Sequence, residues 1–164
     1  MENSFKSYNK EVMKHFTNPK NMGEIKNPDG VGEVGNMRCG DIMKVYLKVD
    51  KKTNIIKDVK FQTFGCVAAI AASDVLCELV KGKTIEEAKK ISNKEITEYL
   101  GGLPSIKLHC SVLGSEALHK AIEDYENHLW FSNFHFLKEQ SSLGLQEHSS
   151  LELAKFQIMK IRSE

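Results

Sequence analysis

Apolar and polar residues alternate along the first half of the chain in a pattern typical of β-strands. Val45, Leu47 and Val49 alternate with Lys44, Tyr46 and Lys48, which predicts a strand with one buried face. Residues 51–54 read as a turn, and Ile55, Val59 and Phe61 suit a second strand that pairs with the first and ends at Gly65-Cys66. The pattern therefore predicts a β-hairpin as the centre of the sheet.

Helical periodicity brackets this hairpin. Apolar residues at helical spacing over residues 8–16 predict a helix that ends at Asn18-Pro19, and a glycine-rich connection then leads to the first cysteine through Gly23, Gly30, Gly32 and Gly35. After the hairpin we expect a helix over 67–81 that stops at Gly82, and two short helices that begin at the capping-box patterns of 84–87 and 92–95. An apolar stripe over 113–125 predicts a final helix.

Strands that come early and helices that come late favour an α+β fold. We expect a small antiparallel sheet of about three strands packed against several α-helices. Residues 1–128 are predicted to form one domain. Residues 129–164 are predicted to be a C-terminal extension of unknown structure, in which the pattern at about 151–161 is compatible with one short helix.

Composition limits the classes of function. The chain has 164 residues, 41% apolar residues and a formal charge of +1, which gives no reason to expect nucleic-acid binding. The first residues lack the apolar stretch of a signal peptide and no run approaches a membrane span, so we expect a cytoplasmic protein that does not bind membranes. Thiols stay reduced there, and the four cysteines indicate metal or sulfur chemistry in preference to disulfides.

Three short segments carry the candidate chemistry. They are Cys39-Gly40-Asp41, Gly65-Cys66 and His109-Cys110, and the cysteines are 27 and 44 residues apart, so only a folded domain can bring them together. Glycine lets the backbone turn Cys39 and Asp41 toward one point, and a helix that begins after Cys66 favours a thiolate there. The candidate site is a nearly complete set of soft-metal ligands: Cys39, Asp41, Cys66, His109 and Cys110.

Each segment also has a simpler interpretation. Cys39 or Cys66 alone could be a structural cysteine, and a lone histidine is usually structural or solvent-exposed. Three such segments together weaken that interpretation. Cys77 lies 11 residues past Cys66 on the same predicted helix, about 16 Å along its axis, among apolar neighbours, so we assign it to the core. The other histidines are interpreted as structural or exposed: His15, His119, His128, His135 and His148.

At these residues the chain resembles the IscU/NifU-type iron–sulfur cluster assembly scaffolds. The shared pattern is an N-terminal helix that contains Tyr8, the Cys39-Gly40-Asp41 loop, Gly65-Cys66 opening an alanine-rich helix, and the segment Leu103-Pro104-Ser105-Ile106-Lys107-Leu108-His109-Cys110-Ser111. The likeness covers roughly residues 5–127, and four motifs in the same order are far more specific than one. The resemblance implies a SufE/NifU-like fold with the ligand site at one end.

The resemblance also implies the role of each candidate residue. Cys39, Cys66 and Cys110 match the family's cluster-binding cysteines, and Asp41 and His109 are the two alternatives for the fourth ligand. Cys110 is the expected acceptor of a persulfide from an IscS/NifS-type cysteine desulfurase, with Cys39 as the alternative. The implied cargo is a [2Fe–2S] cluster, built from iron and sulfur and passed to apo iron–sulfur proteins, so the protein is expected to be a carrier and not an enzyme.

Further partners implied by the family are ferredoxin and an Hsp70-type chaperone. The family segment that such a chaperone recognises usually has two successive prolines, and Ser105 replaces the second one here, which weakens the case for this partner. The oligomeric state, monomer or homodimer, stays open.

Two other functions use the same residues. A zinc protein, structural or a sulfur acceptor of the SufU type, would take the same ligands. SufU-type chains carry an insertion between the second and third cysteines and lack the histidine before the third, so the compact spacing and His109 favour the scaffold. Zinc can still occupy the site in a purified sample. A cysteine-nucleophile enzyme built on Cys110 would leave Cys39 and Cys66 unexplained.

Overall fold

The computed structural model describes residues 8–36 and 40–141 of the chain. The chain divides into two compact units, residues 1–128 and 129–164. The candidate site residues all fall in the first unit, which is described here by itself. The assignment of the units as a functional domain and an extension stays a prediction.

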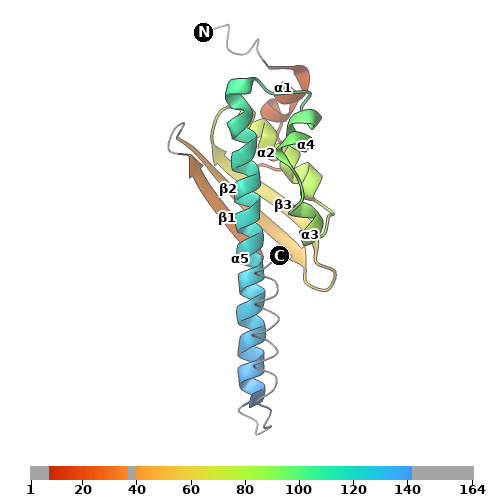
Figure 1. The fold of residues 1–164 in the computed structure, drawn as a ribbon, viewed down its shortest axis with the longest axis vertical. Helices are drawn as coiled ribbons and strands as arrows, with labels where there is room; N and C mark the ends of the chain where they lie inside the picture. Colours follow the sequence, from red (N-terminus) through yellow and green to blue (C-terminus); the bar gives the residue numbers. More distant parts are fainter. Residues whose placement is uncertain (1–7, 37–39, 142–164) are drawn as a thin grey trace. The chain divides into compact units, whose positions relative to one another are not determined.

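The sheet has three antiparallel strands in the order β1-β2-β3 (Figure 1). β1 spans Gly30–Asn36, β2 spans Asp41–Asp50 and β3 spans Ile55–Phe64. β1 and β2 pair from Gly30↔Leu47 to Asn36↔Asp41, and β2 and β3 from Ile42↔Phe64 to Asp50↔Ile55, with an irregularity at Lys48/Val49. The start of β2 and the end of β3 therefore lie side by side at one end of the sheet.

β1 differs from the sequence prediction, which treated its glycines as a connection. Two of these glycines lie directly against a helix: a Cβ atom on Gly30 would overlap the carbonyl oxygen of Ala121, and one on Gly32 would overlap that of Ala117. Any larger side chain would push the helix away from the strand. The glycines thus allow a helix to approach the third strand closely. Glycine has low β-propensity, so the sequence pattern did not indicate a strand here.

Helices account for most of the remaining first unit. α1 spans Lys10–Thr17, α2 spans Val67–Val80, α3 spans Ile85–Ala88 and α4 spans Asn93–Tyr99. The predicted boundaries agree closely with these, and both capping boxes are present, at Thr84 with Glu87 and at Ser92 with Glu95. The chain then forms the 3-10 turn η2, Ser105–Lys107, and the long helix α5, Leu108–Ser141.

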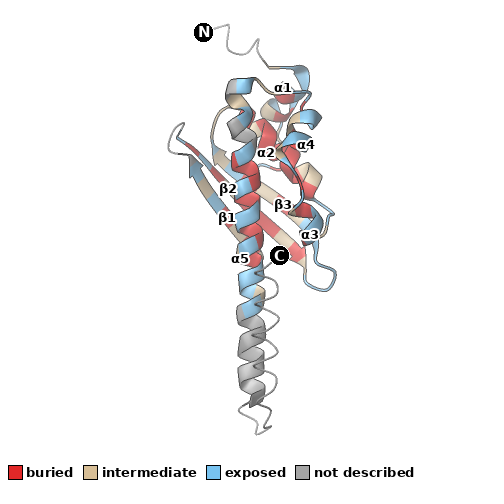
Figure 2. Cartoon of the chain, in the orientation of Figure 1, coloured by how far each residue is buried: buried red, intermediate tan, exposed pale blue. Residues whose placement is uncertain are grey.

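The core lies between the sheet and the helices that cover one of its faces. Figure 1 shows α5 crossing the sheet with α2 beside it, and Figure 2 shows buried residues concentrated on the strands beneath them and along α2. The largest fully buried side chains come from both layers and include Met43, Leu47, Phe61, Leu76 and Leu118. This is the α+β arrangement that the order of elements predicts.

α5 extends beyond the predicted helix at both ends. The apolar stripe over 113–125 marks only the part whose residues are buried in the first unit, including Leu113, Ala117, Leu118, Ala121, Ile122 and Tyr125. The helix begins five residues earlier and continues into the second unit. The short helix predicted at about 151–161 lies outside the described residues. Among those residues, no helix combines the length and the apolarity that crossing a membrane requires.

Candidate functional site

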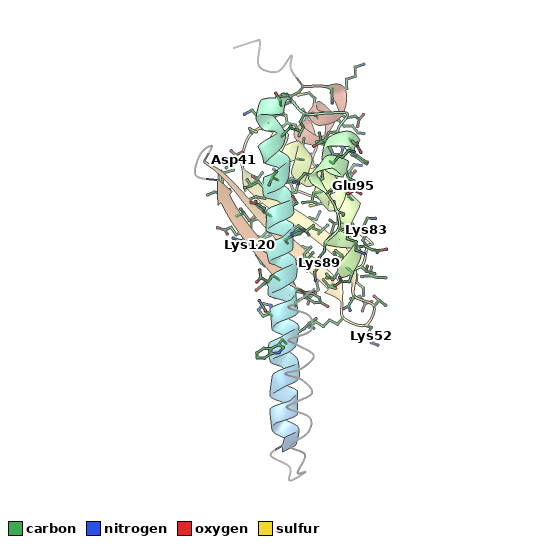
Figure 3. All side chains as sticks on the ribbon, in the orientation of Figure 1. Asp41, Lys52, Lys83, Lys89, Glu95 and Lys120 are labelled. Carbon is green, nitrogen blue, oxygen red and sulfur yellow. The ribbon has the colours of Figure 1, made fainter. Side chains whose placement is uncertain are left out.

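Asp41 and Gly65 face each other at the end of the sheet where β2 begins and β3 ends. Asp41 is the first residue of β2 and is only 7% exposed, although its carboxyl group is polar (Figure 3). A Cβ atom on Gly65 would lie 3.4 Å from Cγ of Asp41, 3.1 Å from Oγ1 of Thr63 and 2.8 Å from Cβ of Ala69. The backbone of Gly65, the residue before Cys66, therefore lies closely against Ala69 and Thr63 and near the Asp41 carboxyl group.

Cys66 is the N-cap residue of α2. It has extended backbone angles and is partly exposed, and its carbonyl oxygen accepts the first hydrogen bond of the helix, from Ile70 N at 3.1 Å. The unpaired N–H groups at the start of a helix carry partial positive charge, which stabilises a thiolate. The sequence prediction that Cys66 opens this helix is confirmed, and Gly65, the residue before it, lies near the Asp41 carboxyl group.

His109 and Cys110 are the second and third residues of α5, and of these two residues only the backbone is described. Adjacent side chains can reach one metal only at a turn or a helix start. α5 begins at Leu108, immediately after η2, so the pair lies at such a start. A second candidate cysteine therefore lies in the first turn of a helix, where the same partial positive charge acts.

The packing of α5 on β1 places this helix start at the Asp41 end of the sheet. Ala121 lies against Gly30 and Ala117 against Gly32, so α5 runs toward its N-terminus as β1 runs toward Asn36. From Ala117 to Cys110 the helix rises about 10 Å, and from Gly32 to Asn36 the strand rises about 13 Å. Asn36 is the partner of Asp41, so the backbone of His109-Cys110 reaches the same end of the sheet.

Cys39 lies outside the described residues. Its neighbour Gly40 has φ of 72°, in the left-handed region that favours glycine, and Asp41 begins β2 directly after it. Gly40 therefore adopts a backbone conformation that its lack of a side chain allows, as the sequence predicts.

Cys77 belongs to the core, as its apolar neighbours predict. It is fully buried in the last turn of α2, and burial raises the pKa of its thiol well above the usual range. A thiol held protonated in this way neither binds a metal nor attacks sulfur.

A buried polar cluster that the sequence analysis missed joins α1 to α2. His15 Nδ1 lies 2.7 Å from Oδ2 of Asp74, whose other oxygen accepts from the backbone N–H of Asn21 at 2.8 Å. Glu78 lies one turn further along α2, and oxygen or nitrogen atoms of His15, Asp74 and Glu78 approach within 4.8 Å of one another. The available signal was Asp74 itself, a charged residue among the apolar residues of the predicted helix 67–81.

In the structure this cluster is a buried hydrogen-bonded group. Two ligand atoms of a tetrahedral zinc ion stand about 3.3 Å apart at bond lengths near 2.0 Å, whereas the His15–Asp74 contact of 2.7 Å is a direct hydrogen bond. Both Asp74 oxygens already accept hydrogen bonds. The structural interpretation of His15 from the sequence is therefore confirmed, and its partner is Asp74.

Exposed apolar side chains flank the site. Phe64 is 83% exposed, and Ile42, its cross-strand partner, is 45% exposed. Phe64 is separated from Cys66 only by Gly65. A large aromatic residue exposed to water close in sequence to a partly exposed thiol is typical of a surface that contacts another protein.

The described residues form a small α+β fold in which the candidate residues Asp41 and Cys66 lie at one end of the sheet and the backbone of His109-Cys110 lies at the start of a helix. The chain matches the model of the NifU-like N terminal domain over residues 7–130, and it belongs to this family.

Two relatives have names that describe their roles. The iron–sulfur cluster assembly scaffold protein IscU 1 of Archaeoglobus fulgidus is 57% identical over 118 residues, which cover 72% of this chain and 76% of the relative. The corresponding IscU of Aquifex aeolicus is 51% identical over 118 residues, covering 72% of this chain and 75% of that protein. Residues 131–164 lie beyond the family match.

Solved structures show the same fold. A candidate iron–sulfur cluster assembly scaffold protein for the SUF system from Fervidobacterium islandicum superposes with a TM-score of 0.59 at 26% identity, covering 73% of this chain and 98% of that one. An N-terminal NifU-like protein from Brucella abortus superposes with a TM-score of 0.58 at 22% identity, over 74% of this chain and 95% of that one. The expected α+β fold of the SufE/NifU type is thereby confirmed.

Proposed function

We propose that this protein is a scaffold on which iron and sulfur are assembled into a [2Fe–2S] cluster that is then passed to apo iron–sulfur proteins. The observation that carries the proposal is the family match over residues 7–130 combined with the three cysteine segments that lie within it. The cluster is cargo, so the protein is a carrier and not an enzyme that turns over a small molecule.

The proposed ligands are Cys39, Cys66 and Cys110, with Asp41 or His109 in the fourth position. Thiolates are the preferred ligands of iron in such clusters, and a carboxylate is a harder and weaker partner. The buried carboxyl group of Asp41 beside Gly65 and Cys66 supports Asp41 for this position. Three strong ligands and one weak ligand suit a cluster that must leave.

Sulfur is proposed to enter on Cys110, with Cys39 as the alternative acceptor. The acceptor thiolate attacks the outer sulfur of a persulfide on a cysteine desulfurase of the IscS/NifS type. The sulfur–sulfur bond of the donor breaks, the donor cysteine leaves as a thiolate, and the acceptor becomes the persulfide. The position of Cys110 in the first turn of α5 supports this role because a helix start favours the attacking thiolate.

The proposed partners follow from these steps. The exposed Phe64 and Ile42 support a contact with the sulfur donor or an acceptor protein next to Cys66. The sulfur of a persulfide must be reduced to sulfide before it enters a cluster, and ferredoxin is a protein reductant of the required class. An Hsp70-type chaperone that recognises residues 103–107 is a weaker proposal because of Ser105.

A zinc-binding sulfur acceptor is the second candidate. One structural neighbour is a SufU protein of the SUF system, and zinc accepts the same thiolate, imidazole and carboxylate ligands. Such a protein would carry sulfur on a cysteine without building a cluster.

Anaerobic reconstitution distinguishes the two candidates. The purified chain is incubated with iron, cysteine and a cysteine desulfurase, and visible absorption, iron, acid-labile sulfide and zinc are measured. We expect cluster absorbance with equal amounts of iron and sulfide, and none in the Cys66→Ser variant. A chain that retains zinc and never develops cluster absorbance contradicts the scaffold function.

A further inference from the structure

The side-chain amide of Asn9 makes three hydrogen bonds that join distant parts of the first unit. Its Oδ1 accepts from the backbone N–H of Val12 at 2.9 Å and so caps the start of α1. Its Nδ2 donates to the carbonyl oxygen of Leu100 at 2.7 Å and to that of Gly102 at 3.3 Å. The Asn9 side chain thus caps α1 and also forms hydrogen bonds with the turn at Leu100 and Gly102, more than ninety residues further along the chain.

The turn that Asn9 holds is built for one conformation. Gly101 and Gly102 have φ of 68° and 101°, values that other residues rarely adopt, and their N–H groups bond back to Glu98 and Thr97 to end α4. A Cβ atom on Gly101 would lie 3.2 Å from Nδ2 of Asn9, so the amide and the turn fit closely.

This turn leads directly into the third candidate segment. Only Leu103 and Pro104 separate Gly102 from η2, and His109-Cys110 follow η2 at the start of α5. Pro104 has a fixed φ, and its carbonyl oxygen accepts from Lys107 N–H at 2.7 Å, so the connection is short and stiff. A restraint at Leu100 and Gly102 therefore acts on the position of α5's first turn.

We infer that Asn9 is a positioning residue for the His109-Cys110 segment and acts through its hydrogen bonds to the turn at Leu100 and Gly102. The effect on cargo rests on the proposed function, whereas the positioning itself does not. The two donated hydrogen bonds carry the inference, since serine or aspartate would cap α1 as well but could not donate to both carbonyl groups.

The test uses Asn9→Asp and Asn9→Ser in the full-length, metal-free chain, with amide hydrogen exchange measured by fragment. Both variants keep a capping oxygen for α1. Aspartate also points a charge at two carbonyl oxygens, so it should have the larger effect. We expect exchange over residues 100–110 to rise about fivefold in Asn9→Ser and about tenfold or more in Asn9→Asp, while residues 10–17 stay close to wild type.

Lys14→Gly is the matched control. It weakens α1 at an exposed position and leaves the three Asn9 hydrogen bonds in place. Exchange should rise over residues 10–17 and stay unchanged over 100–110. The inference is overturned if both Asn9 variants leave residues 100–110 unchanged, or if Lys14→Gly raises exchange there as much as they do.

A second readout connects the segment to cargo. In reconstituted protein, Asn9→Asp should shorten the lifetime of the cluster severalfold relative to wild type and Lys14→Gly. An unchanged lifetime together with raised exchange overturns the link to the site. If wild type itself forms no cluster, the proposed function fails while the exchange result still decides the positioning role.

Discussion

The two described cysteines of α2 share one helix and have opposite environments. Cys66 is the N-cap residue, partly exposed at the end of the sheet, directly after Gly65, which lies near the Asp41 carboxyl group. Cys77 is three turns further along, fully buried, with a pKa that burial raises. A helix start beside solvent favours a thiolate, whereas an apolar helix interior favours the neutral thiol. The comparison teaches that position on the element, more than residue type, separates a thiol available for chemistry from one that packs.

The largest expected effect comes from Cys66→Ser. Removing one of three proposed thiolate ligands should lower the amount of cluster after anaerobic reconstitution at least about tenfold, because even the loss of a residue that only supports a ligand costs about ten- to a hundredfold. Stability in urea should change by less than about 1 kcal/mol, because the side chain is partly exposed. Retention of wild-type cluster levels would place Cys66 outside the site.

Cys77→Ser should show the reverse behaviour. A hydroxyl group in place of the fully buried thiol lowers the free energy of unfolding by about 1–3 kcal/mol, while the cluster content per folded chain stays at the wild-type level. Urea unfolding and iron analysis measure the two quantities. Cys77→Ala, which adds no polar group, should cost less than Cys77→Ser; equal stability of Cys77→Ser and wild type contradicts the core assignment.

Gly65→Ala tests the space beside Asp41. The added methyl group would meet Ala69 Cβ at 2.8 Å and Thr63 Oγ1 at 3.1 Å, so the strand end or the start of α2 must shift, at a cost of about 1–3 kcal/mol. Cluster yield should fall because this shift displaces Cys66, the next residue and a proposed thiolate ligand. Gly35→Ala is the matched control on β1, because nothing lies within 4 Å of its added Cβ; similar losses in both variants would mean that Gly65 has no special role.

The smallest effect concerns acid stability at a distance from the site. The backbone N–H of Ser92 holds the pKa of Glu95 below its usual value, so this glutamate stabilises the fold above about pH 4.5 and the contribution is lost as the pH falls through the lowered pKa. Glu95→Gln should therefore unfold with less pH dependence between about pH 5 and 3. Glu98→Gln, on the same helix, is the control, and equal pH profiles for wild type and Glu95→Gln would contradict this role.

Local signals predicted most of the fold because the elements concerned are local. The capping boxes at Thr84 and Ser92, the alternation over 44–49 and the glycine after α2 each act within a few residues. The candidate site was predictable for a similar reason, since Gly65 and Cys66 mark a strand-to-helix junction. The proximity of Asp41 to Gly65 could not be predicted from the sequence, because it depends on the register between β2 and β3.

Long-range packing explains what the sequence analysis missed. Gly30 and Gly32 look like a flexible connection until α5 is placed against them, and then their lack of side chains is what allows β1 to form. The His15–Asp74 hydrogen bond joins residues 59 positions apart, and the sequence around either residue does not identify the other as its partner. Contacts of this kind arise from the fold and carry no local pattern.

The most direct test of the central claim is the rate at which a reconstituted cluster leaves the protein for an apo-ferredoxin, compared between wild type and Asp41→Ala. If the weak carboxylate beside Cys66 is what makes the cargo transferable, the variant should hold its cluster longer and transfer it more slowly, and Asp41→Cys, with a thiolate in that position, should be slower still. Faster loss of the cluster from Asp41→Ala than from wild type would contradict the claim.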